Sequence, residues 1–184
     1  MKIAVISDLH GNLIYYPSDY WKHLWECEAL FICGDIFPLH IQFDIPKCRS
    51  WLMKEFIPWA TELPVEKVYI IGGNHDSDKI VGKLWEADLI EEYYKLTTIT
   101  VEGDPELPSQ ALTLCHFPMV DWYDKERGAW MVHGHQHQLP GTPSCSVMHW
   151  DVGVDKNNMT PISFEQLKIN ITTQFIKRNE DCSN

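Results

Sequence analysis

The sequence predicts an α/β protein, because short apolar runs alternate with amphipathic stretches along most of the chain. Apolar runs typical of buried parallel strands occur at residues 2–7, 29–33, 68–71, 111–115 and 130–132. Amphipathic stretches with the apolar spacing of helices occur at residues 19–28, 48–63 and about 77–87. Two further segments, 89–102 and 145–154, have extended patterns and suit a second sheet.

The C-terminal part of the sequence predicts one more helix and then a polar tail. Ser163 and Gln166 have the spacing of a capping box, which predicts a short helix to about residue 170. Residues 177–184 are polar and are expected to fray. No repeat, linker or low-complexity block divides the chain, so we expect a single domain at 1–172 followed by a tail at 173–184.

Each of the five apolar runs ends at side chains that can bind a metal ion. The residues that follow the runs, in order, are Asp8 and His10, Asp35, Asn74 and His75, His116, and His135 and His137. In open α/β sheets the loops beyond the carboxyl ends of the strands converge on one crevice. Carboxylate and imidazole groups together suit a borderline divalent cation. The sequence therefore predicts a metal site at this edge of the sheet.

The motifs differ in how specific they are. Asp8 and His10, or Gly34 and Asp35, would each by themselves be an ordinary turn. Gly73-Asn74-His75-Asp76 is sharper, because four fixed residues at roughly 5% usage each occur by chance about once per hundred thousand positions. Gly134-His135-Gln136-His137 is an independent second match, and its two imidazoles project to the same side of an extended segment.

Together these ordered motifs resemble the calcineurin-like metallophosphoesterase superfamily, whose five blocks occur here in order over residues 8–137. The stretch His116-Phe117-Pro118 is similar to that of a subgroup of small single-domain bacterial and phage phosphoesterases. The resemblance implies a four-layer αββα sandwich, in which two mixed β-sheets are flanked by helices. It also implies a dinuclear metal site, with Mn²⁺ expected first and Fe, Zn²⁺ or Co²⁺ open as alternatives.

The resemblance assigns a role to each motif residue. It implies the ligands Asp8, His10 and His137 for the first ion, Asn74, His116 and His135 for the second, and Asp35 as a bridge between them. His75 would be the catalytic histidine beside the ions. In the phosphoprotein phosphatase branch an Asp three residues after the bridging Asp orients this histidine, but position 38 here is Pro. Asp44 and Asp76 are the candidates for that role.

The function that follows is hydrolysis of a phosphomonoester or phosphodiester, in which two ions activate a water for in-line attack. A nucleotide or another small phosphoester would be the substrate. The alternative is a non-catalytic protein-binding module with the same fold. A degenerate scaffold should have lost metal ligands, whereas all seven candidate ligands and His75 are present here.

Composition limits the partners and the compartment. The formal net charge of −11, with no basic run, argues against a long nucleic acid as partner. No apolar stretch approaches the roughly 20 residues needed to cross a bilayer, and no signal peptide is evident, so a cytoplasmic protein is expected. Six cysteines without a C-x-x-C motif suggest reduced, mostly buried thiols. The oligomeric state stays open.

Four other residues have weaker claims to function. His133 lies within a strand pattern, so a buried, hydrogen-bonded histidine is expected rather than a ligand. Trp122 is expected to pack in the core, with stacking on a nucleobase as the alternative. Asp151 and Asp155 would either support the site or belong to turns, and the two interpretations have equal weight.

Overall fold

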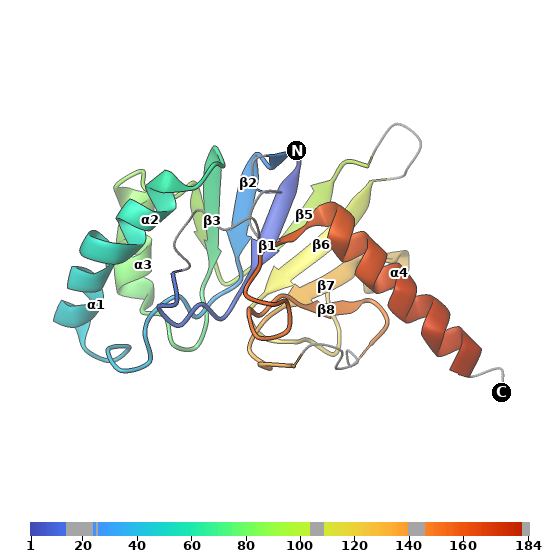
Figure 1. The fold of residues 1–184 in the computed structure, drawn as a ribbon. Coiled ribbons are helices and arrows are strands. Elements are labelled where there is room, and N and C mark those ends of the chain that lie inside the picture. Colours follow the sequence, from blue (N-terminus) through green and yellow to red (C-terminus); the bar gives the residue numbers. More distant parts are fainter. Residues whose placement is uncertain (14–23, 25, 104–108, 140–145, 182–184) are drawn as a thin grey trace.

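The computed structural model describes residues 1–13, 24, 26–103, 109–139 and 146–181, and within them two mixed sheets pack face to face (Figure 1). The first sheet has the order β4 (Glu92–Tyr94), β3 (Lys67–Ile71), β2 (Ala29–Ile32), β1 (Ile3–Ile6) and β9 (Ile162–Ser163). The second has the order β5 (Leu96–Val101), β6 (Gln110–Cys115), β7 (Trp130–His133) and β8 (His149–Asp151).

Parallel pairing brings the carboxyl ends of the motif-bearing strands to one edge of each sheet. β1, β2 and β3 are parallel neighbours, and so are β6, β7 and β8. The antiparallel strands β9 and β5 lie at the outer positions of the two sheets. The loops that follow β1, β2 and β3 therefore lie at one edge of the first sheet. Those that follow β6 and β7 likewise lie at one edge of the second sheet.

The central strands β1 and β2 of the first sheet are buried on both faces, which explains their unbroken apolar sequences. In β1, Ala4 and Ile6 pack with the helices, whereas Ile3 and Val5 pack between the two sheets. This alternation is the period of two expected for a strand. Burial of each isoleucine or valine side chain contributes about 1.5–3 kcal/mol, so both faces stabilise the base of the motif loops.

Helices cover the outer face of the first sheet (Figure 1). A continuous helical segment consists of α1 (Ile45–Trp51), the π-helical turn η2 (Leu52–Phe56) and α2 (Ile57–Glu62). The wider π turn precedes Pro58, whose nitrogen cannot donate the next helical hydrogen bond. α3 (Asp78–Glu86) lies beside this segment. The helices predicted at 48–63 and 77–87 are thus confirmed, whereas most of the one predicted at 19–28 lies outside the described residues.

The second sheet is flanked by α4 (Phe164–Asp181) and by the short 3₁₀ helix η3 (Lys125–Arg127). Phe164 and Leu167 of α4 pack into the core between the sheets, and Trp122 packs with Met131 of β7 on the other face. The predicted αββα class is confirmed by two mixed sheets with flanking helices.

Two details differ from the sequence prediction. The helix that begins after Ser163 continues to Asp181 instead of ending near residue 170. At its start only half of the capping box forms, in which Ser163 Oγ accepts from the backbone N of Gln166 at 3.2 Å. The segment 89–102 is divided between the sheets, because β4 pairs in parallel with β3 of the first sheet and only β5 joins the second. The domain boundary at 172 stays a prediction.

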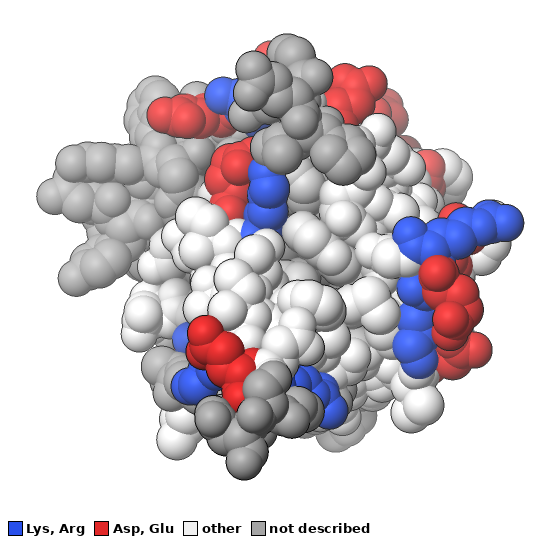
Figure 2. All heavy atoms as spheres, turned by 90° about the vertical axis from the view of Figure 1, so that its right-hand side faces the viewer, with Lys and Arg blue, Asp and Glu red and all other residues white. Residues whose placement is uncertain are grey.

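Figure 2 shows the face of the molecule that lies on the right-hand side of Figure 1. On this face Lys and Arg lie beside Asp and Glu, mainly toward the margins of a broad uncharged area. None of the described helices combines the length and the apolar character needed to span a bilayer.

Candidate metal centre

The two sheets are joined at the base of the site by main-chain hydrogen bonds. Ser7, directly after β1, donates its N–H to Val152 O at 3.0 Å and accepts from Val154 N at 3.1 Å. The next loop is held in the same way, because Asp8 N donates to Gly34 O at 3.0 Å. Residues from both sheets are thereby brought to one place, as the positions of the motifs at the strand ends predict.

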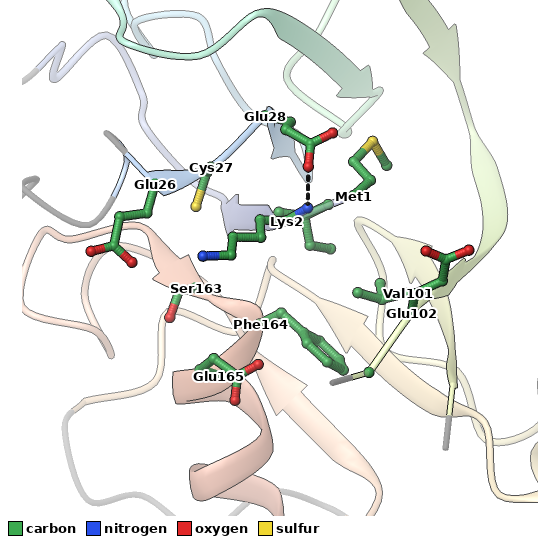
Figure 3. Close-up of a pocket in the computed structure, with 12 residues that line it drawn as sticks. Met1, Lys2, Glu26, Cys27, Glu28, Val101, Glu102, Ser163, Phe164 and Glu165 are labelled. Carbon is green, nitrogen blue, oxygen red and sulfur yellow. Dashed lines mark hydrogen bonds between the residues drawn. The ribbon is translucent and has the colours of Figure 1, made fainter. Parts of the chain in front are cut away.

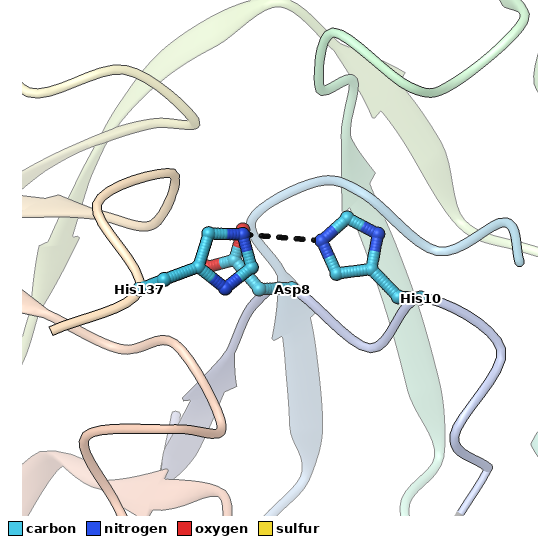
Figure 4. A group of neighbouring side chains, drawn as sticks. All are labelled: Asp8, His10 and His137. Carbon is cyan, nitrogen blue, oxygen red and sulfur yellow. Dashed lines mark hydrogen bonds and ion pairs between the residues drawn. The ribbon is translucent and has the colours of Figure 1, made fainter. Parts of the chain in front are cut away.

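Asp8, His10 and His137 form the first group of side chains that could hold a metal ion (Figure 4). The Nε2 atoms of the two histidines are 3.3 Å apart, and His137 Nε2 lies 3.8 Å from Asp8 Oδ1. His137 Nδ1 is 2.6 Å from Asp155 Oδ2, to which it donates. Since Nδ1 of His137 holds its proton toward Asp155, Nε2 is free to bind a cation beside His10.

His116 belongs to a second group, with Asp8 and Asp35. Its Nδ1 donates to the backbone oxygen of Cys33 at 2.9 Å. Its Nε2 lies 3.3 Å from Asp35 Oδ2 and 2.9 Å from Asn74 Oδ1. A neutral imidazole that donates from Nδ1 has no second proton to offer these two oxygens. An additional positive charge, either a proton or a divalent cation, fits this arrangement, so the donor set suits a metal ion.

Asp35 lies at the centre of the site. Its Oδ2 is 3.3 Å from His116 Nε2, 3.8 Å from His10 Nε2 and 3.9 Å from His75 Nε2. Its Oδ1 accepts the backbone N–H of His75 at 2.9 Å. Burial alone would raise the pKa of Asp35, but the hydrogen bonds from His116 and His75 outweigh burial and hold that pKa below its usual value. An ionised carboxylate at this position can serve two cations at once.

His135 contributes to the site mainly through its backbone. Its N–H donates to both carboxylate oxygens of Asp8, at 3.1 and 3.0 Å. Its exposed ring lies edge-on to those of His116 and Phe117, with centroids 5.2 and 4.8 Å away. Its side chain belongs to neither of the two groups found among the described residues. The structure thus places the ring beside the second group without bringing its nitrogens to the carboxylates.

Electrostatics in the site favour a bound cation. Burial raises the pKa of Asp8 to about 6, although His116 and His137 oppose that effect. Burial also lowers the pKa of His10, whose buried Nδ1 has no hydrogen-bond partner in the described part of the chain. The imidazole pKa of His137 is raised instead, because the hydrogen bond to Asp155 outweighs burial. Burial disfavours both the ionised carboxylate and the protonated imidazole. A bound cation would stabilise the ionised carboxylate and would bind the neutral imidazole, so both groups are suited to be ligands.

The backbone of the site is unusual. Five site residues have φ between 44° and 70°, a left-handed region that residues other than glycine seldom adopt: Asp8, His10, Asp35, His135 and His137. Two glycines allow the loops to approach. A Cβ at Gly73 would lie 2.1 Å from Asp35 Oδ1, and one at Gly134 would lie 2.5 Å from Asp8 Oδ2. Neither position can carry a side chain without displacing a carboxylate.

Comparison with known families supports the site's interpretation. A family model described as the calcineurin-like phosphoesterase superfamily domain matches residues 1–154. The chain belongs to this superfamily. A comparison with curated proteins finds no match.

Two solved structures are similar to this superfamily member. One is a novel archaeal phosphodiesterase, with a TM-score of 0.46 and 18% identity over 85% of this chain and 84% of that chain. The other is a predicted phosphoesterase from Streptococcus pneumoniae TIGR4, with a TM-score of 0.39 and 18% identity over 84% of this chain and 72% of that chain. The assignment to the superfamily rests on the family model.

Two residues support the site in ways that the sequence did not predict. Asp76 was a candidate to orient His75, but its carboxylate instead accepts backbone N–H groups from both the Asp35 loop and the Gly73 loop. Gln42 accepts a hydrogen bond from His75 Nδ1. No motif marks Gln42, and only its position between two prolines in a loop near the site hints at a role.

The residues with weaker claims divide as follows. His133 is buried and donates from Nδ1 to Gly134 O at 2.9 Å, as expected for a structural histidine. Trp122 is 7% exposed and donates to Ala129 O, so it packs rather than stacks on a ligand. Asp155 supports His137, whereas Asp151 is buried and accepts from the backbone of Gly153 at 2.8 Å.

A cavity of about 340 Å³ lies at the other end of β1 from the metal centre (Figure 3). Its lining includes Lys2 and four carboxylates, those of Glu26, Glu28, Glu102 and Glu165. The backbone N of Lys2 donates to Glu28 at 3.0 Å. Because none of the motif residues lines this cavity and its charge would repel a phosphoester, it is separate from the candidate site of this superfamily member.

Proposed function

We propose that this protein is a dinuclear metal-dependent hydrolase of small phosphomonoesters or phosphodiesters. The observation that carries the proposal is the position of Asp35 Oδ2, within 4 Å of the Nε2 atoms of three histidines that come from three different loops. Membership of the calcineurin-like phosphoesterase superfamily supports the same activity. A non-catalytic scaffold would have no need for so many converging ligand atoms.

The proposed ligands are Asp8, His10 and His137 for one cation, Asn74, His116 and His135 for the other, and Asp35 for both. Divalent cations supply Lewis acidity toward phosphoryl oxygens and lower the pKa of water. Mn²⁺ is the first candidate, with Fe, Zn²⁺ and Co²⁺ as alternatives, because oxygen and nitrogen ligands without thiolate do not select among them. Asn74 contributes a neutral oxygen, which avoids a further negative charge facing an anionic substrate.

His75 is the proposed general acid. Its Nδ1–H donates to Gln42, so Nε2 is the nitrogen that takes up and releases a proton on the side of the site. A proton on Nε2 can be given to the leaving oxygen of the ester, a contribution of typically 10²- to 10⁴-fold in rate. The side chain is 29% exposed, which leaves the ring accessible to a substrate from solvent.

The charge of the protein supports a small substrate. A formal net charge of −11 repels a long polyanion, whereas two bound divalent cations concentrate positive charge within one site. Among the described cysteines, Cys33, Cys48 and Cys115 are buried thiols outside any disulfide, which supports the proposal of a reducing, cytoplasmic compartment.

Elemental analysis and hydrolysis assays test the proposal. The wild type should hold two metal ions per chain and hydrolyse p-nitrophenyl phosphate or bis-(p-nitrophenyl) phosphate with Mn²⁺, whereas Asp35→Asn should lose most of the activity and at least one ion. Asp121→Asn is the matched control, because that carboxylate is 84% exposed and is not one of the proposed ligands. Fewer than two ions in the wild type, or equal activity in the wild type and Asp35→Asn, would overturn the proposal.

A further inference from the structure

The two nitrogens of His75 have different surroundings. Nε2 faces the metal centre, 3.9 Å from Asp35 Oδ2. Nδ1 is hydrogen-bonded to Oε1 of Gln42. An amide oxygen can only accept, so the shared proton belongs to Nδ1 of the imidazole. This one bond therefore fixes both the orientation of the ring and the nitrogen that remains available for proton transfer.

The two carboxylates that the sequence suggested as partners of His75 have other partners. Asp76 accepts the backbone N–H groups of Asp35, Ile36 and Gly73, at 2.8, 2.8 and 2.9 Å. Asp44 caps α1 through Lys47 N at 3.1 Å and pairs with the ammonium group of the same lysine at 2.9 Å. Neither carboxylate holds the imidazole, so the two candidates that the sequence offered for this role are both replaced by Gln42.

Gln42 projects from a well-anchored loop. The preceding residue, Ile41, is only 6% exposed, and its backbone oxygen accepts from Asp44 N at 2.8 Å and from Cys48 Sγ at 3.0 Å. Asp44 in turn begins α1. The Gln42 backbone is thus held between a buried side chain and a helix cap, which fixes the point from which its side chain reaches His75.

We propose that Gln42 is a positioning residue for His75, which holds Nε2 toward the scissile ester through a neutral acceptor. This inference rests on the proposed function. A carboxylate at the same place would orient the ring equally well, but it would add a negative charge beside Asp35 and an anionic substrate. The amide gives the orientation without that charge.

Three variants separate positioning from a general structural effect. Gln42→Met removes the acceptor at similar side-chain length, Gln42→Glu keeps an acceptor in place, and Phe43→Ala changes an adjacent side chain that is 85% exposed. We expect Gln42→Met to lower kcat by about 10- to 100-fold with KM and metal content near wild type, because a misaligned group loses its orientation advantage. Gln42→Glu should recover most of kcat but raise KM, and Phe43→Ala should match the wild type.

The leaving group gives a second readout that a structural role would not move. An alkyl phosphate needs its leaving oxygen protonated, whereas p-nitrophenolate leaves without a proton. The loss of kcat in Gln42→Met should therefore be larger for an alkyl phosphate than for p-nitrophenyl phosphate. In a His75→Ala background Gln42→Met should have no further effect, as expected for two residues that act through one contact.

The outcomes distinguish this inference from the function on which it rests. Full activity of Gln42→Met on both esters, equal losses on both, or an undiminished loss in the His75→Ala background would overturn the positioning role while the phosphoesterase activity stands. A wild type that holds metal but hydrolyses neither ester would overturn the proposed function and the positioning role together.

Discussion

Replacing Asp8 by Asn should stabilise the metal-free protein while it removes metal binding. The Asp8 side chain is almost fully buried, and burial raises its pKa from 3.8 to about 6. At 1.36 kcal/mol per pKa unit, this shift corresponds to about 3 kcal/mol of destabilisation once the group is ionised. Asn keeps an oxygen that can accept the His135 N–H but carries no charge.

The sign of the pH dependence follows from the two pKa values. Well below pH 4 the carboxyl group is protonated in both the folded and the unfolded chain and contributes nothing. Between about pH 4 and pH 6 the folded chain binds more protons than the unfolded one, so stability falls as pH rises. Above about pH 6 the full destabilisation is present, and only a bound cation relieves it.

Urea unfolding of EDTA-treated wild type and Asp8→Asn, between pH 4 and pH 8, measures this effect. The free energy of unfolding of the variant should exceed that of the wild type by about 3 kcal/mol at pH 8 and by far less at pH 4, and the comparison cancels the other titrating groups. Added Mn²⁺ should then stabilise only the wild type. Parallel pH profiles for the two proteins, or a variant less stable than the wild type at pH 8, would refute the reasoning.

Two further predictions concern single side chains of the site. His75→Ala should lower kcat by about 10²- to 10⁴-fold with an unchanged metal content, as measured by steady-state kinetics and elemental analysis. If both metal ions were lost, His75 would be a ligand and not an acid. Asp155→Ala should weaken metal binding by about 10- to 100-fold, because His137 loses the acceptor that fixes its Nδ1 proton. An unchanged affinity of Asp155→Ala for Mn²⁺, measured by equilibrium dialysis, would contradict this prediction.

The motif residues were predictable because their positions depend on strand polarity. A buried parallel strand has a continuous apolar sequence, and the residue after it must lie at the carboxyl edge of the sheet. The runs that precede Asp8 and Asp35 are of this kind, so the convergence of these two residues follows from the sequence. The structure confirms it, because Asp8 N donates to Gly34 O at 3.0 Å. His116 follows a strand of the second sheet, and it comes within 3.3 Å of Asp35 Oδ2 only because the two sheets pack together.

The remaining features depend on contacts that leave no local pattern. Gln42 has no motif, and its role arises only because a capped helix start and the buried Ile41 bring it to His75. The strand pattern of 89–102 indicates extended structure but not the sheet that each half joins. The length of α4 was underestimated because polar residues at its end suggest fraying, although most of them are good helix formers.

The construction of the site from two sheets has a mechanical consequence. Asp8, His10 and Asp35 follow strands of the first sheet, whereas His116 and His137 follow strands of the second. A cation shared by His10 and His137 would join residues 127 positions apart and thus close a loop that spans most of the chain. Such an ion is a removable cross-link between the two halves of the sandwich, made and broken without covalent chemistry. The concentration of free metal ion would then determine how strongly the two sheets are held together, as well as whether the site is occupied.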